Sequence, residues 1–139
     1  GLALANAGLG AVHGFAGPLG GMISAPHGAI CASLLPYVME INIQALQRRE
    51  PDSKAIEHYN IIAQILTNKP DSQAANAVEW LHNLCSSLQI PSLGKLGLKE
   101  HDFQAAIDKA RRSSSMKGNP IQLTDDELYK IMEKAFSQN

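Results

Sequence analysis

Two histidines in the first third of the chain have surroundings that could support metal chemistry. His13 and His27 are 14 residues apart, and each is followed by a glycine and has a proline nearby. Their neighbours are small and uncharged, so a polar imidazole there needs a partner. One interpretation is two core histidines bonded to backbone carbonyls. Because imidazole is a common ligand for zinc, iron, copper and nickel, and glycine permits close approach, the pair favours a metal site.

The remaining histidines and the basic residues carry weaker signals. His82 lies beside Trp80 and is predicted to pack near an apolar stripe, whereas His58 and His101 have charged neighbours and are predicted to be solvated. One small basic group has no interleaved aromatic residues, which favours a solvated face over a nucleic-acid contact. Its members are Lys109, Arg111, Arg112 and Lys117.

Composition narrows the class of protein. The net charge is −1, from 12 basic and 13 acidic residues, so nothing indicates binding to nucleic acid or to an anionic membrane. Cys31 and Cys85 are far apart and in no CxxC pair, which predicts buried thiols in the reducing cytoplasm rather than a disulfide. The apolar stretch 29–46 is interrupted by polar residues and Pro36, so we expect no membrane span.

Charge is unevenly distributed along the chain. Residues 1–47 contain one formal charge, at Glu40. So large an uncharged segment of a soluble domain must be covered by something. The chain also starts without an initiator methionine or a capping residue, as the middle of a helix would. We therefore expect further sequence upstream of Gly1.

The elements that must position the two histidines are helical. A short helix is expected over residues 2–7, followed by a broken or tightly packed helix over 12–22, where glycines and Pro18 gather. The next helix is predicted to start at Pro26 and run to about Leu46, with a kink at Pro36.

The second half of the chain shows apolar residues at helical spacing of three and four. Predicted helix starts are Pro51-Asp52, Pro70-Asp71, Phe103 and the Thr124–Glu127 capping box. Residues 90–97 and 113–119 are predicted to be connections. Because no alternating strand pattern occurs, the fold class is predicted to be all-α, as an irregular or orthogonal helical bundle.

The glycine-rich histidine segment resembles the iron-containing alcohol dehydrogenase family, within the dehydroquinate synthase-like fold. The matching residues are His13, Pro18-Leu19-Gly20, Pro26-His27-Gly28, Leu35-Pro36 and Asn42. The resemblance continues at Asn119-Pro120 before the capping box, so it spans essentially the whole chain.

The resemblance implies a two-domain enzyme. Residues 1–139 would be its helical metal- and substrate-binding domain, and an N-terminal Rossmann-like domain, absent from this chain, would bind most of the NAD or NADP. Family members hold a divalent metal, Fe²⁺ or Zn²⁺, through one Asp and three His, of which His13 and His27 would be the last two. The other two ligands come from an Asp-x-x-x-His motif that this chain lacks. Two imidazoles alone make a weak site.

One position departs from the family pattern. Many members carry a second histidine four residues after the one matched by His13, where it is thought to help proton transfer near the nicotinamide. This chain has Gly17 there. A proton relay through that position is therefore absent, which leaves the substrate class open.

The expected function is NAD(P)-dependent interconversion of a small alcohol and an aldehyde or ketone, with the metal as Lewis acid. The chain alone is expected to be inactive and to need its N-terminal domain, and a homodimer is left open. Alternatives are a free-standing helical binding module without catalysis, or a maleylacetate-reductase-like or transhydrogenase-like enzyme of the same fold.

Overall fold

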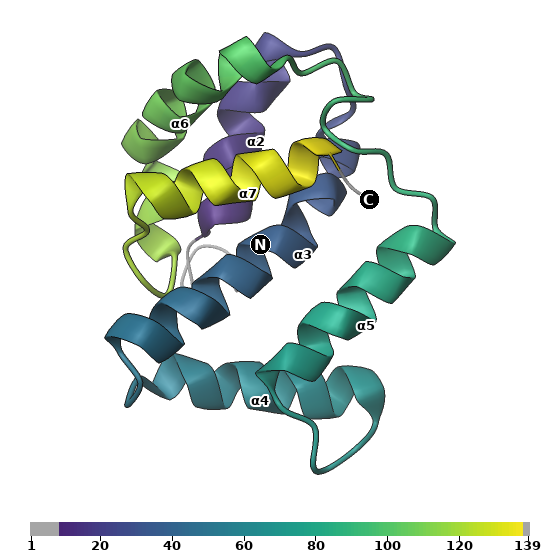
Figure 1. The fold of residues 1–139 in the computed structure, drawn as a ribbon, viewed down its shortest axis with the longest axis vertical. Coiled ribbons are helices and arrows are strands. Elements are labelled where there is room, and N and C mark those ends of the chain that lie inside the picture. Colours follow the sequence, from purple (N-terminus) through teal and green to yellow (C-terminus); the bar gives the residue numbers. More distant parts are fainter. Residues whose placement is uncertain (1–8, 138–139) are drawn as a thin grey trace.

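The computed structural model describes residues 9–137, and over that range the chain is helical without strands. This range contains six α-helices and two short 3-10 segments, one on either side of α6 (Phe103–Arg112) in the sequence (Figure 1). The α-helices are α2 (Ala11–Met22), α3 (His27–Arg49), α4 (Lys54–Thr67), α5 (Ala74–Ser87), α6 (Phe103–Arg112) and α7 (Asp125–Ser137). The 3-10 segments are η1 (Glu100–Asp102) and η2 (Ser114–Gly118). The all-α prediction is confirmed, and the helix expected over residues 2–7 lies outside the described residues.

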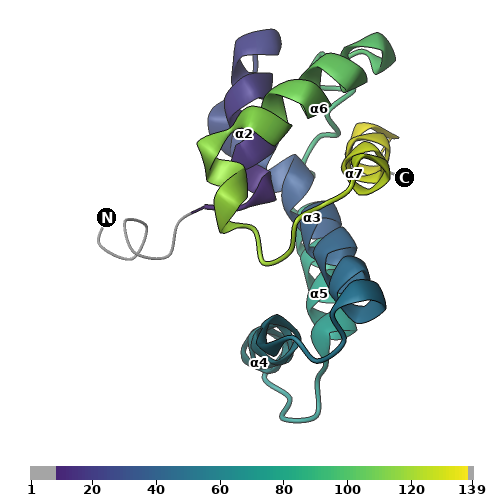
Figure 2. The same cartoon turned by 90° about the vertical axis from the view of Figure 1, so that its left-hand side faces the viewer.

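Helix α3 is the centre of the arrangement. It packs against α2, α4, α5 and α7, while α6 packs on the far side of α2 and on α7. Figures 1 and 2 both place α2 and α6 at one end of the domain and the α4–α5 pair at the other. The helices cross at varied angles, as expected for an irregular bundle.

The main core lies where α2, α3, α6 and α7 meet. Burial of such apolar side chains supplies most of the driving force for folding. The largest fully buried residues of this core are Phe15, Leu19, Ile30, Leu34, Ile41, Leu93, Leu98, Ile107, Leu128, Ile131 and Met132.

Of the two alternatives predicted for residues 12–22, the tightly packed helix is confirmed and the broken helix is not. Helix α2 continues through its glycines and through Pro18. The reason is tertiary packing: Ala11, Phe15 and Leu19 follow a four-residue spacing and are fully buried, which outweighs poor helix propensity. Close packing also explains Gly14, where an added Cβ would come within 2.8 Å of the Met116 side chain.

Helix α3 begins at His27, directly after Pro26, and continues through Pro36 to Arg49 rather than ending near Leu46. The kink expected at Pro36 stays a prediction. The length and composition of α3 would suffice to cross a membrane, but 61% of the relevant window is buried inside the protein. That burial is typical of the core helix of a globular domain.

Two helices begin later than their prolines suggested. Helix α4 starts at Lys54, where the Ser53 hydroxyl accepts a hydrogen bond from the N–H of Ala55 at 3.2 Å. Helix α5 starts at Ala74, capped by Gln73 and Asn76. In both cases a polar capping residue satisfies free backbone donors and sets the start, while the proline lies in the preceding turn.

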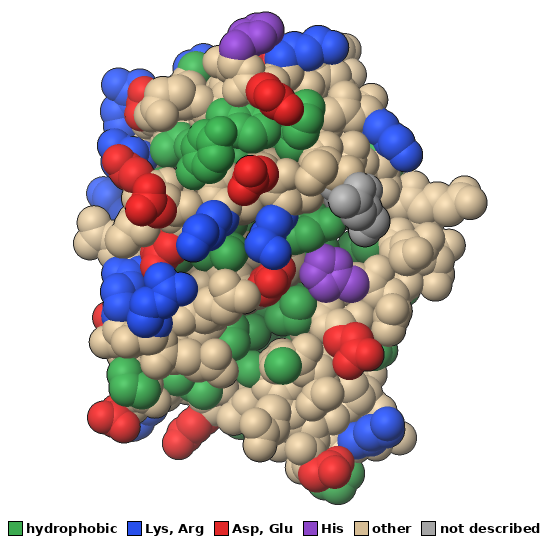
Figure 3. Space-filling model, viewed as in Figure 1, with side chains coloured by type: hydrophobic (Ala, Val, Ile, Leu, Met, Phe, Trp, Pro, Cys, Tyr) green, Lys and Arg blue, Asp and Glu red, His purple; other side chains and the backbone are tan. Residues whose placement is uncertain are grey.

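The predicted capping box of the last helix is confirmed. The N–H of Glu127 donates to the Thr124 hydroxyl at 3.3 Å, and the N–H of Thr124 donates to the Glu127 carboxylate at 2.8 Å. Figure 3 shows acidic and basic side chains interspersed over the face that carries α7. This mixture agrees with the near-neutral net charge.

Candidate metal centre

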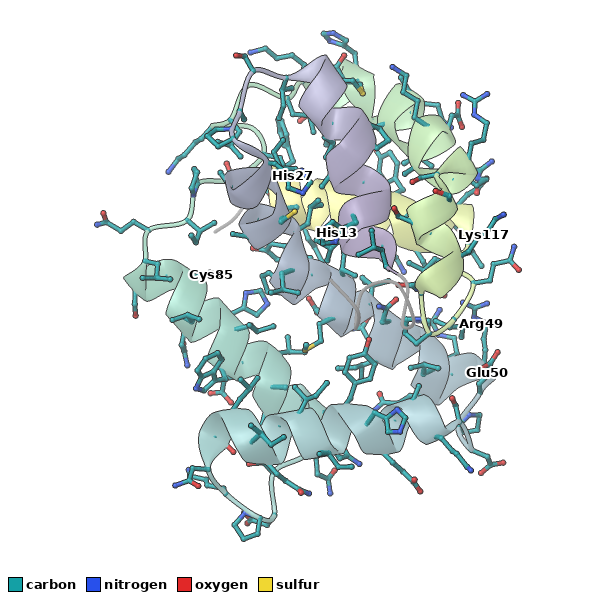
Figure 4. All side chains as sticks on the ribbon, turned by 180° about the vertical axis from the view of Figure 1, so that it is seen from behind. His13, His27, Arg49, Glu50, Cys85 and Lys117 are labelled. Carbon is teal, nitrogen blue, oxygen red and sulfur yellow. The ribbon has the colours of Figure 1, made fainter. Side chains whose placement is uncertain are left out.

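The two histidines singled out from the sequence come together between α2 and α3. His13 lies in the first turn of α2 and His27 is the first residue of α3, and Figure 4 shows the two on these neighbouring helices. Their ring centroids are 5.6 Å apart, with an angle of 49° between the ring planes. His27 is exposed and His13 is partly buried, so an ion from solvent could reach both rings.

A third donor joins the pair. Cys31 lies one helical turn after His27, and its Sγ is 3.4 Å from His27 Nε2. The donor atoms of His13, His27 and Cys31 all lie within 4.8 Å of one another. The sequence prediction treated Cys31 only as a buried thiol, although its four-residue spacing from His27 places both on one helix face and could have revealed the contact.

The electrostatic state of Cys31 follows from its surroundings. Partial burial raises the pKa of its thiol above the ordinary value. The neutral thiol is therefore the favoured form near neutral pH, where it contacts the His27 ring. A metal ion at the same place would reverse that preference, because a coordinating thiol is deprotonated outright.

A cavity of about 520 Å³ opens beside His13. Its wall is mostly apolar and comes from α2, α3 and the segment around Pro120. The polar residues that line it are His13, Cys31, Asn42, Tyr59 and Asn119. An apolar cavity with a few convergent polar groups is the usual form of a small-molecule site.

Two asparagines that line this cavity hydrogen-bond to each other. Asn119 Nδ2 donates to Asn42 Oδ1 at 2.8 Å, and Asn42 Nδ2 donates to Asn119 Oδ1 at 3.2 Å. The same Asn119 oxygen accepts the N–H of Ala11 at 3.1 Å, and Asn42 also donates to the Tyr59 hydroxyl at 3.3 Å. Asn119 thus ties the start of α2, which carries His13, to α3.

The donor set fits a divalent transition metal in part. Imidazole and thiolate suit zinc, and imidazole also suits iron. Among the described residues this cluster contains no carboxylate. The cluster therefore offers nitrogen and sulfur donors alone.

The other residues considered from the sequence lie away from this centre. His82 packs edge-on against Tyr37 with ring centroids 5.1 Å apart, as a packing residue would. His101 is exposed beside Asp102. Cys85 is a half-buried free thiol on α5. Gly17 is exposed, and nothing lies within 4 Å of the Cβ that another residue would place there.

The fold and the histidine segment define a member of a known enzyme family. The Fe-containing alcohol dehydrogenase family, C-terminal, matches residues 1–136, so this chain belongs to that family. The resemblance found in the sequence is thereby confirmed.

Individual relatives agree with the assignment. Alcohol dehydrogenase 4 of Saccharomyces cerevisiae is 32% identical over 137 residues, which is 98% of this chain and 34% of that protein. Lactaldehyde reductase of Escherichia coli is 32% identical and covers 98% of this chain and 35% of its own length. The solved alcohol dehydrogenase from Oenococcus oeni superposes with a TM-score of 0.74 at 31% identity, over 92% of this chain and 33% of that chain.

Length is the main difference from these relatives. The chain spans about a third of each protein that it matches. It corresponds to the part of the family that the matching model describes as C-terminal.

Proposed function

We propose that this chain is the metal- and substrate-binding domain of an NAD(P)-dependent oxidoreductase that interconverts a small alcohol and an aldehyde or ketone. The observation that carries the proposal is the convergence of His13 and His27, 14 residues apart in sequence, with ring centroids 5.6 Å apart beside a cavity. An independent pair of core histidines has no need to share a solvent-accessible face with a third donor.

His13 and His27 would hold the divalent ion, Fe²⁺ or Zn²⁺. When bound, the ion supplies Lewis-acid polarisation of the substrate oxygen. The remaining ligands would come from upstream sequence, since the chain has no Asp-x-x-x-His motif. That upstream sequence would also supply the nucleotide-binding domain.

The cavity beside His13 would receive the carbon skeleton of the substrate. Its mostly apolar wall favours a small aliphatic group. The side-chain amides of Asn42 and Asn119 hydrogen-bond to each other. These two residues would therefore hold α2 and α3 in position and take no part in proton transfer. Gly17 contributes no side chain, so proton transfer has to use another group or water.

Several features support the choice of small-molecule partners. Relatives are named alcohol dehydrogenase, 1,3-propanediol dehydrogenase and lactaldehyde reductase, and both propanediol and lactaldehyde are small molecules. The near-neutral net charge argues against nucleic-acid or membrane partners. Two free thiols fit the reducing cytoplasm.

The test is an activity assay on the protein expressed from its complete coding sequence. Reduction of NAD or NADP would be followed with primary alcohols and 1,3-diols, after metal removal and after reloading with Fe²⁺ or Zn²⁺. We expect activity that depends on metal and falls by about 100–1,000-fold in His13→Ala and in His27→Ala, as for loss of a transition-state charge stabiliser. His58→Ala, at an exposed position of α4, is the matched control. Activity unaffected by either substitution would refute the proposal.

A further inference from the structure

Cys31 contacts both the main core and a candidate metal ligand. Its side chain is half-buried at the edge of the cavity, where it packs against the core, and its Sγ lies against the His27 ring. The second cysteine, Cys85, shows the contrasting case: its Sγ contacts the carbonyl of Ala32 at 3.8 Å and has no histidine in hydrogen-bonding range. Only one of the two thiols therefore lies at the paired imidazoles.

The spacing between donor atoms matches that of metal ligands. A tetrahedral ion with bonds of about 2.0–2.1 Å to nitrogen and about 2.3 Å to sulfur separates those two ligand atoms by about 3.5 Å. The separation between Cys31 Sγ and His27 Nε2 is 3.4 Å. All three donor atoms lie within 4.8 Å of one another, so small rotamer changes would bring His13 to the same distance.

We propose that Cys31 is a third metal ligand, so that this chain by itself forms a His₂Cys site with His13 and His27. The inference rests on the proposed metal site and extends its ligand set. It also changes the expectation that two imidazoles alone would bind metal weakly. Three protein ligands are enough for a zinc site that keeps one position open for water or substrate.

A thiolate ligand has a consequence for which metal is preferred. Sulfur is softer than nitrogen or oxygen and selects zinc over ions that favour oxygen ligands. The site should therefore hold Zn²⁺ or Co²⁺ more tightly than Fe²⁺. Substitution of Cys31 should reduce the difference in affinity between Zn²⁺ and Fe²⁺, because two histidines without a thiolate discriminate less between these ions.

A competing interpretation assigns Cys31 to the outer shell. In that case its thiol would only hydrogen-bond to His27 and orient the ring. Outer-shell partners change metal affinity by about 10–100-fold, so affinity alone would separate the two interpretations poorly. A direct sulfur–metal bond has its own signature, the thiolate-to-cobalt charge-transfer absorption in the near ultraviolet.

The experiment titrates the full 139-residue chain with Co²⁺ and then Zn²⁺ under anaerobic, reducing conditions. Absorption reports sulfur bonding, and calorimetry reports affinity. Variants are Cys31→Ser, which keeps a hydrogen-bonding group, Cys85→Ser as the matched control, and His13→Ala. Circular dichroism of each variant checks that it is folded.

We expect one Co²⁺ per chain with a charge-transfer band that Cys31→Ser removes and Cys85→Ser retains. The affinity for Zn²⁺ should fall by more than about 100-fold in Cys31→Ser, beyond the range of outer-shell effects. If metal binds to wild-type and Cys31→Ser chains without that band, but not to His13→Ala, the histidine site stands and the role of Cys31 is refuted. Absence of metal binding by the wild-type chain also refutes the role of Cys31. The proposed function is then still decided by whether the activity of the complete protein depends on metal.

Discussion

Asn42 and Asn119, 77 residues apart, face each other through their side-chain amides and exchange two hydrogen bonds of 2.8 and 3.2 Å. The Asn119 amide also donates to the carbonyl of Ile121 at 2.8 Å and accepts from the N–H of Ala11 at 3.1 Å. A single side chain thus joins α2, α3 and the connection before α7. Because α2 carries His13 and α3 carries His27, this junction helps to set the distance between the two rings.

Asn119→Ala should destabilise the domain. The substitution leaves the Ala11 N–H and the side-chain oxygen of the buried Asn42 without their partners, while Asn42 Nδ2 keeps its bond to Tyr59. Two unsatisfied groups cost about 1–3 kcal/mol in the free energy of unfolding. Urea denaturation followed by circular dichroism measures it. Asn83→Ala, at an exposed position of α5, should change stability by less than about 0.5 kcal/mol. Equal effects of the two substitutions would show that the amide pair is not a structural junction.

The glycines divide into close-packed and free positions. An added Cβ at Gly118 would clash with the backbone carbonyl of Leu9, which cannot move aside without distorting the chain. At Gly17 no atom lies within 4 Å of an added Cβ. Gly118→Ala should lower the unfolding free energy by about 1–3 kcal/mol. Gly17→Ala, on the exposed side of α2, should raise it by about 0.5–1 kcal/mol through helix propensity. Thermal unfolding of both variants checks the opposite signs, and a stabilising Gly118→Ala would contradict the packing described.

Glu127 combines a helix cap with an ion pair in which the carboxylate is buried and Arg49 is exposed. Its carboxylate accepts from the N–H of Thr124 and from the Arg49 guanidinium, both at 2.8 Å, and the residue is 5% exposed. Glu127→Ala should cost about 1–3 kcal/mol, because it removes the cap and the carboxylate partner of Arg49, which keeps only its bond to the Gln122 carbonyl. Asp125→Ala breaks the exposed pair with Arg111 and should cost less than about 1 kcal/mol. The reverse order, measured by denaturant midpoints, would be inconsistent with this difference in burial.

Tyr59 should make stability depend on alkaline pH. Burial raises the pKa of its phenol above the ordinary 10.0, and the hydrogen bond from Asn42 offsets only part of that rise. The unfolded phenol ionises first, so its contribution to stability is fully present below about pH 10 and is lost as pH rises through the folded pKa. Tyr59→Phe should flatten the decline measured between about pH 8 and about pH 11.

Part of that decline should remain in the Tyr59 variant. Burial also raises the pKa of Tyr37, with smaller contributions from the charges of Cys85 and Glu40. The double variant Tyr37→Phe, Tyr59→Phe should be flatter still. Identical slopes in the wild-type chain and both variants would show that neither phenol is responsible.

The sequence predicted the helical class and the capping box at Thr124 because both depend on the local pattern of residues. It predicted the convergence of His13 and His27 because both lie in one short glycine-rich segment that resembles a family motif. It placed the starts of α4 and α5 too early, since proline was taken as the start although Ser53 and Gln73 cap the helices. It left open whether α2 breaks at its glycines because helix propensity is local, whereas the burial of Phe15 and Leu19 that maintains the helix is a tertiary effect. It missed the Asn42–Asn119 pair for the same reason, because two residues 77 positions apart share no local signal.

The central claim, that His13 and His27 bind one metal ion, is tested most directly by anomalous X-ray diffraction. Crystals of the protein expressed from its complete coding sequence, loaded with Zn²⁺, would be measured on both sides of the zinc absorption edge. The account predicts an anomalous peak about 2.0–2.1 Å from one ring nitrogen of His13 and of His27. A zinc peak elsewhere, or the two rings turned away from a common point, would contradict it.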